Sequence, residues 1–178
     1  MVYWVQTICR RKKIIKKTVI LLNGPSSSGK STLSQALQSR IGQERNQQYG
    51  IISIDDFMKI ATDETIYEDD VFEINEDMCR AAAEILKESS GVIIDHVITS
   101  QRIFEQLVEL LGNFQIRTVH VSCPLEVLLQ REQARGNRCI GSAEASYTYL
   151  YPKDGYDLTV DNAAMAPEEN AALICGLL

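Results

Sequence analysis

Eight consecutive residues, Gly24 to Ser31, fill every position of the pattern G-x-x-x-x-G-K-[ST]. An apolar run from Thr18 to Asn23 precedes them, and a segment with helical spacing follows. A glycine-rich loop between a strand and a helix presents backbone N–H groups to an anion, and the positive end of the helix adds to this attraction. The sequence therefore predicts a phosphate-binding loop, with a Gly/Ser-rich turn that binds nothing as the alternative.

The residues of this loop divide the expected phosphate chemistry between them. We expect Lys30 to reach the β- and γ-phosphates of a nucleotide, and the Ser31 hydroxyl to bind Mg²⁺. The predicted cofactors are therefore ATP and Mg²⁺. The expected nucleotide contacts in this part of the chain are Gly24, Pro25, Ser26, Ser27, Ser28, Gly29, Lys30, Ser31 and Thr32.

Two aspartates, Asp55 and Asp95, each end an apolar segment further along the chain. Ligands of open parallel sheets lie beyond the carboxyl ends of the strands, so both carboxylates are expected near the phosphate loop. We expect Asp95 to bind Mg²⁺ beside the Ser31 hydroxyl, and Asp55 to accept the proton of an attacking hydroxyl. The alternative for each is a cap of the following turn, and Asp56 could exchange roles with Asp55.

Three arginines form the remaining charged group. Arg131 and Arg135 are four residues apart and so share a helix face, and Arg138 follows in a loop. Guanidinium groups suit the negative charge of transferring phosphates, so we expect all three to contact the nucleotide, and Arg131 and Arg135 to act in catalysis with Lys30. A solvated helix end with cations near its C-terminus is the alternative. We expect the segment from Arg131 to Tyr151 to form a mobile lid.

The elements that must position these residues alternate between strand and helix. Such alternation predicts an α/β fold with a parallel sheet covered on both faces. The first helix should end at Gly42, another should be capped near Ser100, and the last should open at Pro167. The expected strands are 18–23, 50–54, 91–94, 115–121 and 157–160.

Length and composition limit the possible classes. The 178 residues suffice for one domain, which we place at 17–178, after a basic N-terminal extension at 1–16. A net charge of −6 argues against a general nucleic-acid binder, although the basic extension could still contact nucleic acid or an acidic partner. No apolar run is long enough for a membrane span, and five scattered cysteines without C-x-x-C spacing favour the cytoplasm. The sequence does not indicate an oligomeric state.

Two histidines and an acidic segment complete the candidates. His96 borders the expected cleft, where it could touch a substrate, whereas His120 alternates with valines as a strand residue does. The acidic segment 63–77 is typical of a solvated surface. If that segment instead covers the acceptor site, it would favour neutral or cationic acceptors over anionic ones.

Four stretches of the chain together resemble the chloramphenicol phosphotransferase family of P-loop kinases, and the similarity runs from about residue 18 to 175. The resemblance implies a five-stranded parallel sheet in the order 2-3-1-4-5, as in shikimate and nucleoside monophosphate kinases. It also implies that Asp95 lies next to Ser31 and that Asp55, farther out at the acceptor site, is the catalytic base. The stretches are Leu22 to Ser31, Ile54-Asp55, Ile93 to Asp95, and Arg131 to Arg138, which carries the lid arginines.

The chain departs from the family pattern at three places. Pro25 replaces a small residue of the loop, His96 stands where the family has a second acidic residue, and the stretch from Met58 to Met78 is unlike the antibiotic-binding part. The reaction type is therefore expected to carry over better than the acceptor.

The combined prediction is an ATP-dependent phosphotransferase that moves the γ-phosphoryl group to a hydroxyl of a small molecule, resembling chloramphenicol 3-O-phosphotransferase. Two alternatives remain at this point. One is a nucleotide or polynucleotide kinase, against which the acidic charge speaks. The other is a non-catalytic ATP-binding switch, which would not need Asp55 at the end of a strand.

Overall fold

The computed structural model describes residues 15–58, 67–135 and 141–178. Its centre is a five-stranded sheet in the order β2-β3-β1-β4-β5, and every neighbouring pair of strands is parallel. This arrangement confirms the predicted fold class and strand order. The strands are β1 (Ile15–Asn23), β2 (Tyr49–Ser53), β3 (Gly91–His96), β4 (Phe114–Ser122) and β5 (Leu158–Asp161).

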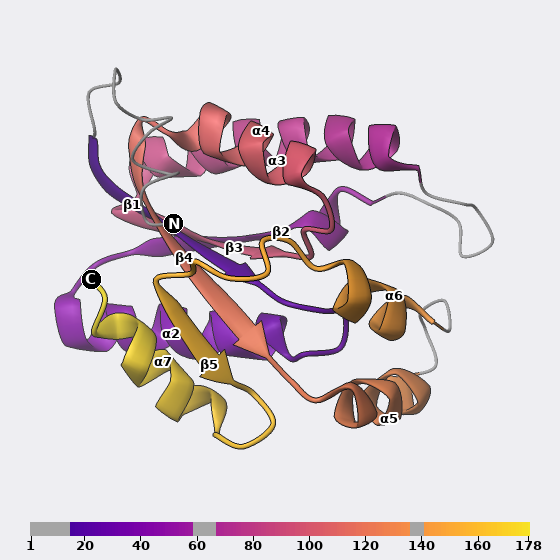
Figure 1. Ribbon diagram of the computed structural model, residues 1–178. Coiled ribbons are helices and arrows are strands. Elements are labelled where there is room, and N and C mark those ends of the chain that lie inside the picture. The colour runs from indigo at the N-terminus through magenta and orange to yellow at the C-terminus, as the bar shows by residue number, and fades with distance from the viewer. Residues whose placement is uncertain (1–14, 59–66, 136–140) are drawn as a thin grey trace.

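Helices cover both faces of this sheet. Figure 1 shows α3 and α4 on one face, α2 and α7 on the other, and α5 and α6 beyond one end of the strands. Within the described part of the chain, no helix has the length and apolar character needed to cross a bilayer. The helices are α2 (Lys30–Arg45), the 3₁₀ turn η1 (Ile54–Asp56), α3 (Glu68–Glu88), α4 (Gln101–Leu111), α5 (Leu125–Arg135), α6 (Ser142–Tyr149) and α7 (Pro167–Cys175).

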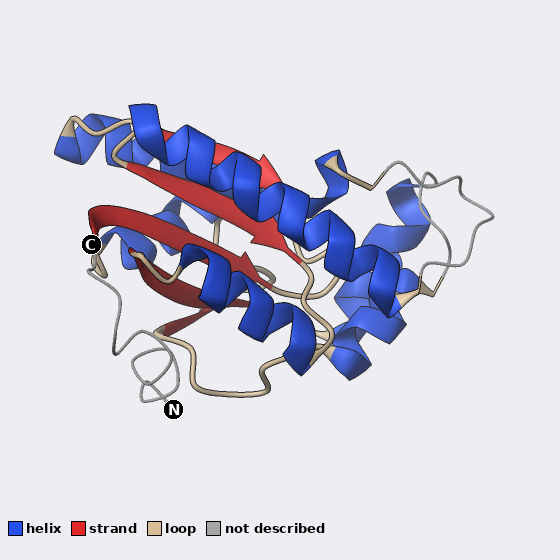
Figure 2. Cartoon of the chain, turned by 90° about the horizontal axis from the view of Figure 1, so that it is seen from above, coloured by secondary structure: helices blue, strands red, loops and turns tan. Residues whose placement is uncertain are grey.

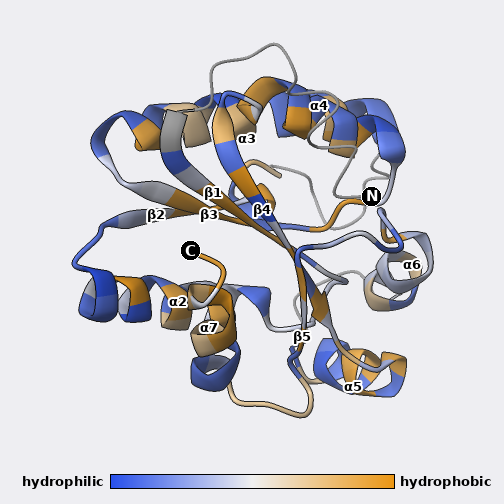
Figure 3. Ribbon diagram, turned by 60° about the vertical axis from the view of Figure 1, so that its left-hand side comes forward, coloured by the Kyte–Doolittle hydropathy of each residue, from blue (hydrophilic) through white to orange (hydrophobic). Residues whose placement is uncertain are grey.

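The alternation of side chains along β1 builds two cores at once. Val19 and Leu21 point into the cluster beneath α3 and α4, while Ile20 and Leu22 point into the cluster beneath α2 and α7. All four side chains are fully buried. A strand buried on both faces must be apolar at every position, which is why β1 appears in the sequence as an unbroken apolar run. Figure 3 shows the same apolar colouring along the central strands.

Most helix ends follow local sequence signals, and one does not. The Ser100 hydroxyl accepts a hydrogen bond from the Ile103 N–H and caps α4, and α7 opens at Pro167, as predicted. The predicted end of α2 at Gly42 is wrong, because the helix continues to Arg45. Asn46 takes the left-handed conformation, with φ 50°, that a helix end requires.

The parallel strands bring all their carboxyl ends to one edge of the sheet, as the strand arrows in Figure 2 show. At this edge the fully buried Asn23 connects three segments. Its amide donates to the Tyr151 carbonyl and the Tyr156 hydroxyl, both at 2.8 Å, and its oxygen accepts from the Ile98 N–H at 2.9 Å. The segment between α6 and β5 is thereby held against the ends of β1 and β3.

Candidate active site

The phosphate loop joins β1 to α2 and needs glycine at both ends of its motif. A Cβ on Gly24 would lie 2.5 Å from the Val121 carbonyl oxygen, because the loop crosses the end of β4 at close range. Gly29 has φ +87°, and a Cβ there would lie 2.9 Å from the Asn162 amide nitrogen. Steric contact with β4 and β5 therefore requires the two glycines that define the motif.

Lys30 is the first residue of α2, and its side chain folds back into the loop. The ammonium group donates to the carbonyls of Gly24 at 3.0 Å and Pro25 at 2.9 Å. It also lies 3.8 Å from a carboxylate oxygen of Asp95, and both side chains are buried. The positive charge is thus held on the concave side of the loop, where negatively charged phosphate oxygens would bind.

Ser31 and Asp95 meet at the same place. The Ser31 hydroxyl donates to Asp95 Oδ2 at 2.7 Å. The alternation along β3 explains the contact: Ile93 points toward the α2 side of the sheet, so Asp95, two residues later, does so as well. The family resemblance placed these residues side by side, and the distance agrees.

This pair of oxygen ligands fits a magnesium ion. The described residues contain no group of three or more His, Cys, Asp or Glu side chains that could hold a metal. Mg²⁺ usually needs only one or two protein ligands, because water and substrate phosphates complete its octahedron. One hydroxyl and one carboxylate beside a phosphate loop are therefore sufficient.

The two candidate bases occupy different positions in the turn after β2. Ser53 caps η1, and the Asp56 carboxylate accepts from the Ser53 N–H at 3.2 Å. Asp55 donates its own N–H to the Ser53 hydroxyl at 3.3 Å, and both aspartates are exposed. The capping role thus belongs to the Asp56 carboxylate, which favours Asp55 over Asp56 as the residue for acceptor chemistry. Ser53 pairs with Asp95 across β2 and β3, so Asp55 lies at the same edge of the sheet as Ser31 and Asp95.

One arginine of α5 reaches the loop from the β4 side. The half-buried Arg131 donates to the carbonyls of Ser28 at 3.3 Å and Asn162 at 3.0 Å, so its guanidinium also holds backbone in place. Arg135, one turn later, is exposed. Arg138 lies outside the described residues.

A cavity of about 690 Å³ opens beside the phosphate loop, within the size range of cofactor sites. Five of the predicted contact residues line it, together with a segment after β5 that was not predicted to contact the nucleotide. The predicted ones are Ser27, Gly29, Thr32, Arg131 and Arg135, and the added ones are 162–167 and Ala134. The carboxyl-edge rule could have pointed to 162–167, because this segment directly follows the fifth strand.

His96 does not face the cleft. It is fully buried on the α3 side of the sheet, and its Nε2 lies 3.1 Å from the Asn75 side-chain oxygen. Burial, with a smaller contribution from the nearby charge of Lys30, lowers the pKa of His96 to about 3. The suggestion that His96 touches substrate is therefore wrong: alternation directs Asp95 and His96 to opposite faces of the sheet.

Comparison with known proteins agrees with this geometry. The model of the family described as chloramphenicol phosphotransferase-like protein matches residues 17–178. The chain belongs to this family. No curated protein sequence matches it significantly.

Solved structures share the fold of this chain at low sequence identity. The Mycobacterium tuberculosis APS kinase CysC, in complex with AMPPNP and APS, superposes with a TM-score of 0.72 at 16% identity, over 91% of this chain and 97% of that one. A sugar kinase from Janibacter sp. HTCC2649 gives 0.68 at 15% identity, over 90% and 93%. A gluconokinase from Sinorhizobium meliloti 1021 gives 0.65 at 17%, over 91% and 92%. The chain therefore has the fold of P-loop kinases.

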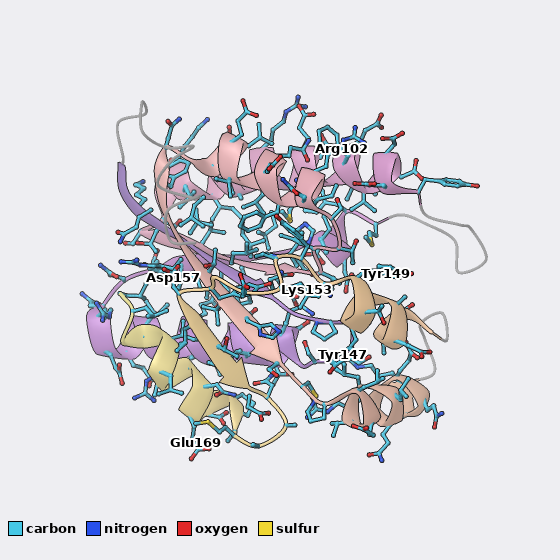
Figure 4. The ribbon with its side chains drawn as sticks, in the orientation of Figure 1. Arg102, Tyr147, Tyr149, Lys153, Asp157 and Glu169 are labelled. Atoms are coloured by element: carbon cyan, nitrogen blue, oxygen red, sulfur yellow. The ribbon has the colours of Figure 1, made fainter. Side chains whose placement is uncertain are left out.

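Sequence reasoning missed helix α6, which packs against the phosphate loop. The buried Glu132 carboxylate anchors its start by accepting from the N–H groups of Gly141 at 3.0 Å and Ala143 at 2.7 Å. The Ser146 hydroxyl accepts from the Ser26 N–H at 2.9 Å. Figure 4 shows Tyr147 and Tyr149 on α6, and both are exposed. The described parts of the predicted lid are thus two ordered helices, and its closure stays a prediction.

Proposed function

We propose that this protein transfers the γ-phosphoryl group of Mg·ATP to a hydroxyl of a small molecule. The observation that carries the proposal is the contact of Ser31 with Asp95 at the mouth of a phosphate loop that encloses Lys30. Two oxygen ligands for Mg²⁺, a buried lysine and a loop of backbone N–H donors are the parts that phosphoryl transfer requires. Membership of a family described as chloramphenicol phosphotransferase-like supports the same reaction type.

The nucleotide would bind across the phosphate loop, with its base in the 690 Å³ cavity. The loop N–H groups and Lys30 would hold the β- and γ-phosphates, and Arg135 would approach the transferring group from α5. Mg²⁺ held by Ser31 and Asp95 would neutralise charge on the phosphates. Lys30 can bind the phosphates because its ammonium group already lies within hydrogen-bond distance of the loop backbone.

Asp55 would act at the acceptor. Asp55 follows the carboxyl end of β2, two strands from β1, and does not line the cavity beside the phosphate loop, which supports an acceptor entering on this side. There it would orient the hydroxyl and take its proton as the oxygen attacks phosphorus. The start of α3 carries three exposed acidic residues, Glu68, Asp69 and Asp70. Such a charge favours a neutral or cationic acceptor over a nucleic acid.

The acceptor is tested by measuring ADP release from Mg·ATP in the presence of hydroxylated metabolites and antibiotics, chloramphenicol included. We expect at least one neutral or cationic alcohol to stimulate release. Stimulation by nucleotides or by oligonucleotide ends alone would replace this function with that of a nucleotide or polynucleotide kinase. ATP binding without any stimulated release would favour a switch.

Two neighbouring variants then test the mechanism. Asp55→Asn should bind Mg·ATP nearly as well as the wild type and lose about a hundredfold or more in transfer, since a positioned base contributes roughly 10² to 10⁴. Asp56→Asn is the matched control, because it removes the neighbouring negative charge while the asparagine oxygen can still accept from the Ser53 N–H, and it should lose much less activity. An exchange of these two outcomes would move the base by one residue, and full activity in both would refute carboxylate catalysis after β2.

A further inference from the structure

The carbonyl oxygen of Ser28, in the middle of the phosphate loop, receives two side-chain hydrogen bonds. The Asn162 amide donates to it at 2.9 Å from the end of β5, and Arg131 Nη1 donates at 3.3 Å from α5. Asn162 is 134 residues away in sequence and only 8% exposed. Two side-chain donors on one loop carbonyl restrain the orientation of this peptide unit.

The held carbonyl fixes the direction of the next N–H group. The Ser28 carbonyl and the Gly29 N–H belong to one planar trans peptide unit, so they point in opposite directions. Anchoring the carbonyl toward β5 therefore turns the Gly29 N–H toward the concave side of the loop. Within the described part of the chain, no hydrogen bond from the Gly29 N–H to another group of the protein is found. Donors on the carbonyl also polarise the peptide and strengthen its N–H as a donor.

Asn162 is itself held in place by a second buried asparagine. Asn170, in the first turns of α7, is fully buried and donates to the Asn162 side-chain oxygen at 2.9 Å and to the Asp161 carbonyl at 3.0 Å. These bonds fix which end of the Asn162 amide faces Ser28. Among the described residues the Asn170 oxygen has no hydrogen-bond partner, and an unpaired buried acceptor reduces stability. Packing alone does not explain why two asparagines, Asn162 and Asn170, are buried beside the loop.

We propose that Asn162 is a positioning residue for phosphate binding, which holds the Ser28–Gly29 peptide so that the Gly29 N–H faces the phosphates, and that Asn170 orients it. This inference rests on the proposed function, because it concerns the same nucleotide site. Its class of ligand is the diphosphate or triphosphate part of a nucleotide. The contact of Asn162 with this peptide also requires glycine at position 29, because a Cβ there would collide with the Asn162 amide.

The test compares ADP affinity, measured by titration calorimetry with Mg²⁺ present, in the wild type and in Asn162→Leu. Leucine has a similar volume and no charge, but it cannot donate to Ser28. A hydrogen bond to a charged group accounts for roughly tenfold to a hundredfold in affinity. Since Arg131 still holds the carbonyl, we expect ADP to bind about tenfold more weakly to N162L. Asn170→Ala leaves Asn162 in place and should weaken ADP binding less, by about threefold.

Asp157→Ala is the matched control for a purely structural effect. Asp157 lies just before the start of β5, where its carboxylate accepts from the Thr118 N–H at 2.7 Å, and Figure 4 shows it at the end of the strands away from α5 and α6. D157A should lower the unfolding temperature and leave the ADP dissociation constant unchanged.

The outcomes separate the inference from the function on which it rests. Equal ADP affinity in folded N162L and the wild type would overturn the inference alone. No ADP binding by the wild type would overturn the proposed function, and the inference with it. If N162L does not fold, as judged by circular dichroism, N170A decides: unchanged affinity there overturns the inference, and weaker binding without a change in D157A supports it.

Discussion

His96 should make the stability of this protein depend on pH between pH 7 and pH 5, above the ordinary pKa values of Asp and Glu side chains. It is fully buried, and burial lowers its pKa from 6.5 to about 3. Between these two values the unfolded chain binds a proton at this position and the folded chain does not. Stability is therefore complete above about pH 6.5 and falls as the pH falls toward 3.

The size of the effect follows from the shift. One proton difference changes the free energy of unfolding by about 1.36 kcal/mol per pH unit. Titration from pH 7 to pH 5 covers about 1.5 units below the unfolded pKa, which gives a loss of about 2 kcal/mol. For a chain of this length, that loss lowers the unfolding temperature by roughly 4 to 8 °C.

His96→Gln provides the comparison, because a glutamine amide can still donate to the Asn75 oxygen but does not titrate. Thermal unfolding of both proteins at pH 7, 6 and 5, followed by circular dichroism, gives the two slopes. We expect the variant to be less stable at pH 7 but to lose about 2 kcal/mol less than the wild type on acidification. Equal slopes would refute the reasoning, since they would mean that His96 takes up its proton in the folded state as readily as in the unfolded chain.

Three further outcomes are expected. Mg·ATP at a hundredfold excess over its dissociation constant should stabilise the wild type by about 2.7 kcal/mol in a thermal melt, and Lys30→Ala should lose most of this gain; no shift in the wild type would contradict the phosphate-loop assignment. Asp95→Asn should raise the Mg²⁺ concentration needed for half-maximal ADP release, whereas an equal loss at every Mg²⁺ concentration would indicate a structural role. Glu132→Gln places an amide group where the carboxylate accepts two N–H groups, at a cost of about 1 to 3 kcal/mol. Hydrogen exchange at Gly141 and Ala143 should then become faster while exchange in β1 stays unchanged, and unaltered exchange at the two amides would show that Glu132 does not anchor α6.

The sequence predicted what depends on short-range patterns. The loop from Gly24 to Ser31 could be recognised because its glycines, lysine and serine are contiguous, and β1 because both its faces are buried. Asp95 could be placed because it ends an apolar strand, and the carboxyl ends of parallel strands share one edge of the sheet, while its position beside Ser31 followed from the family resemblance. The strand order came from family resemblance, and the structure confirmed it.

The unexpected contacts depend on residues far apart in the chain. Asn162 is 134 residues from Ser28, and Ser146 is 120 residues from Ser26, so no local sequence pattern predicts either contact. Helix α6 has only eight residues, and much of what fixes it is a buried carboxylate from α5 rather than its own spacing. His96 was misjudged for a different reason: its place next to Asp95 in sequence suggested a shared cleft, whereas pleating separates neighbours.

The central position of β1 has a consequence for the order of synthesis. The strand that leads into the phosphate loop pairs with β3 and β4, and the loop is then closed from the side by residues after β5. A ribosome releases β1 and its loop first, and β3 and β4 later. Asn162, which holds the loop, and Asn170 in α7, which holds Asn162, emerge last. Pairing across such long separations is slow. Chains shortened before Pro167 lack Asn170 and the apolar side chains of α7 that pack against α2, so they should bind ADP more weakly although the motif is intact. ADP binding can then serve as a sign that the C-terminal helix has docked.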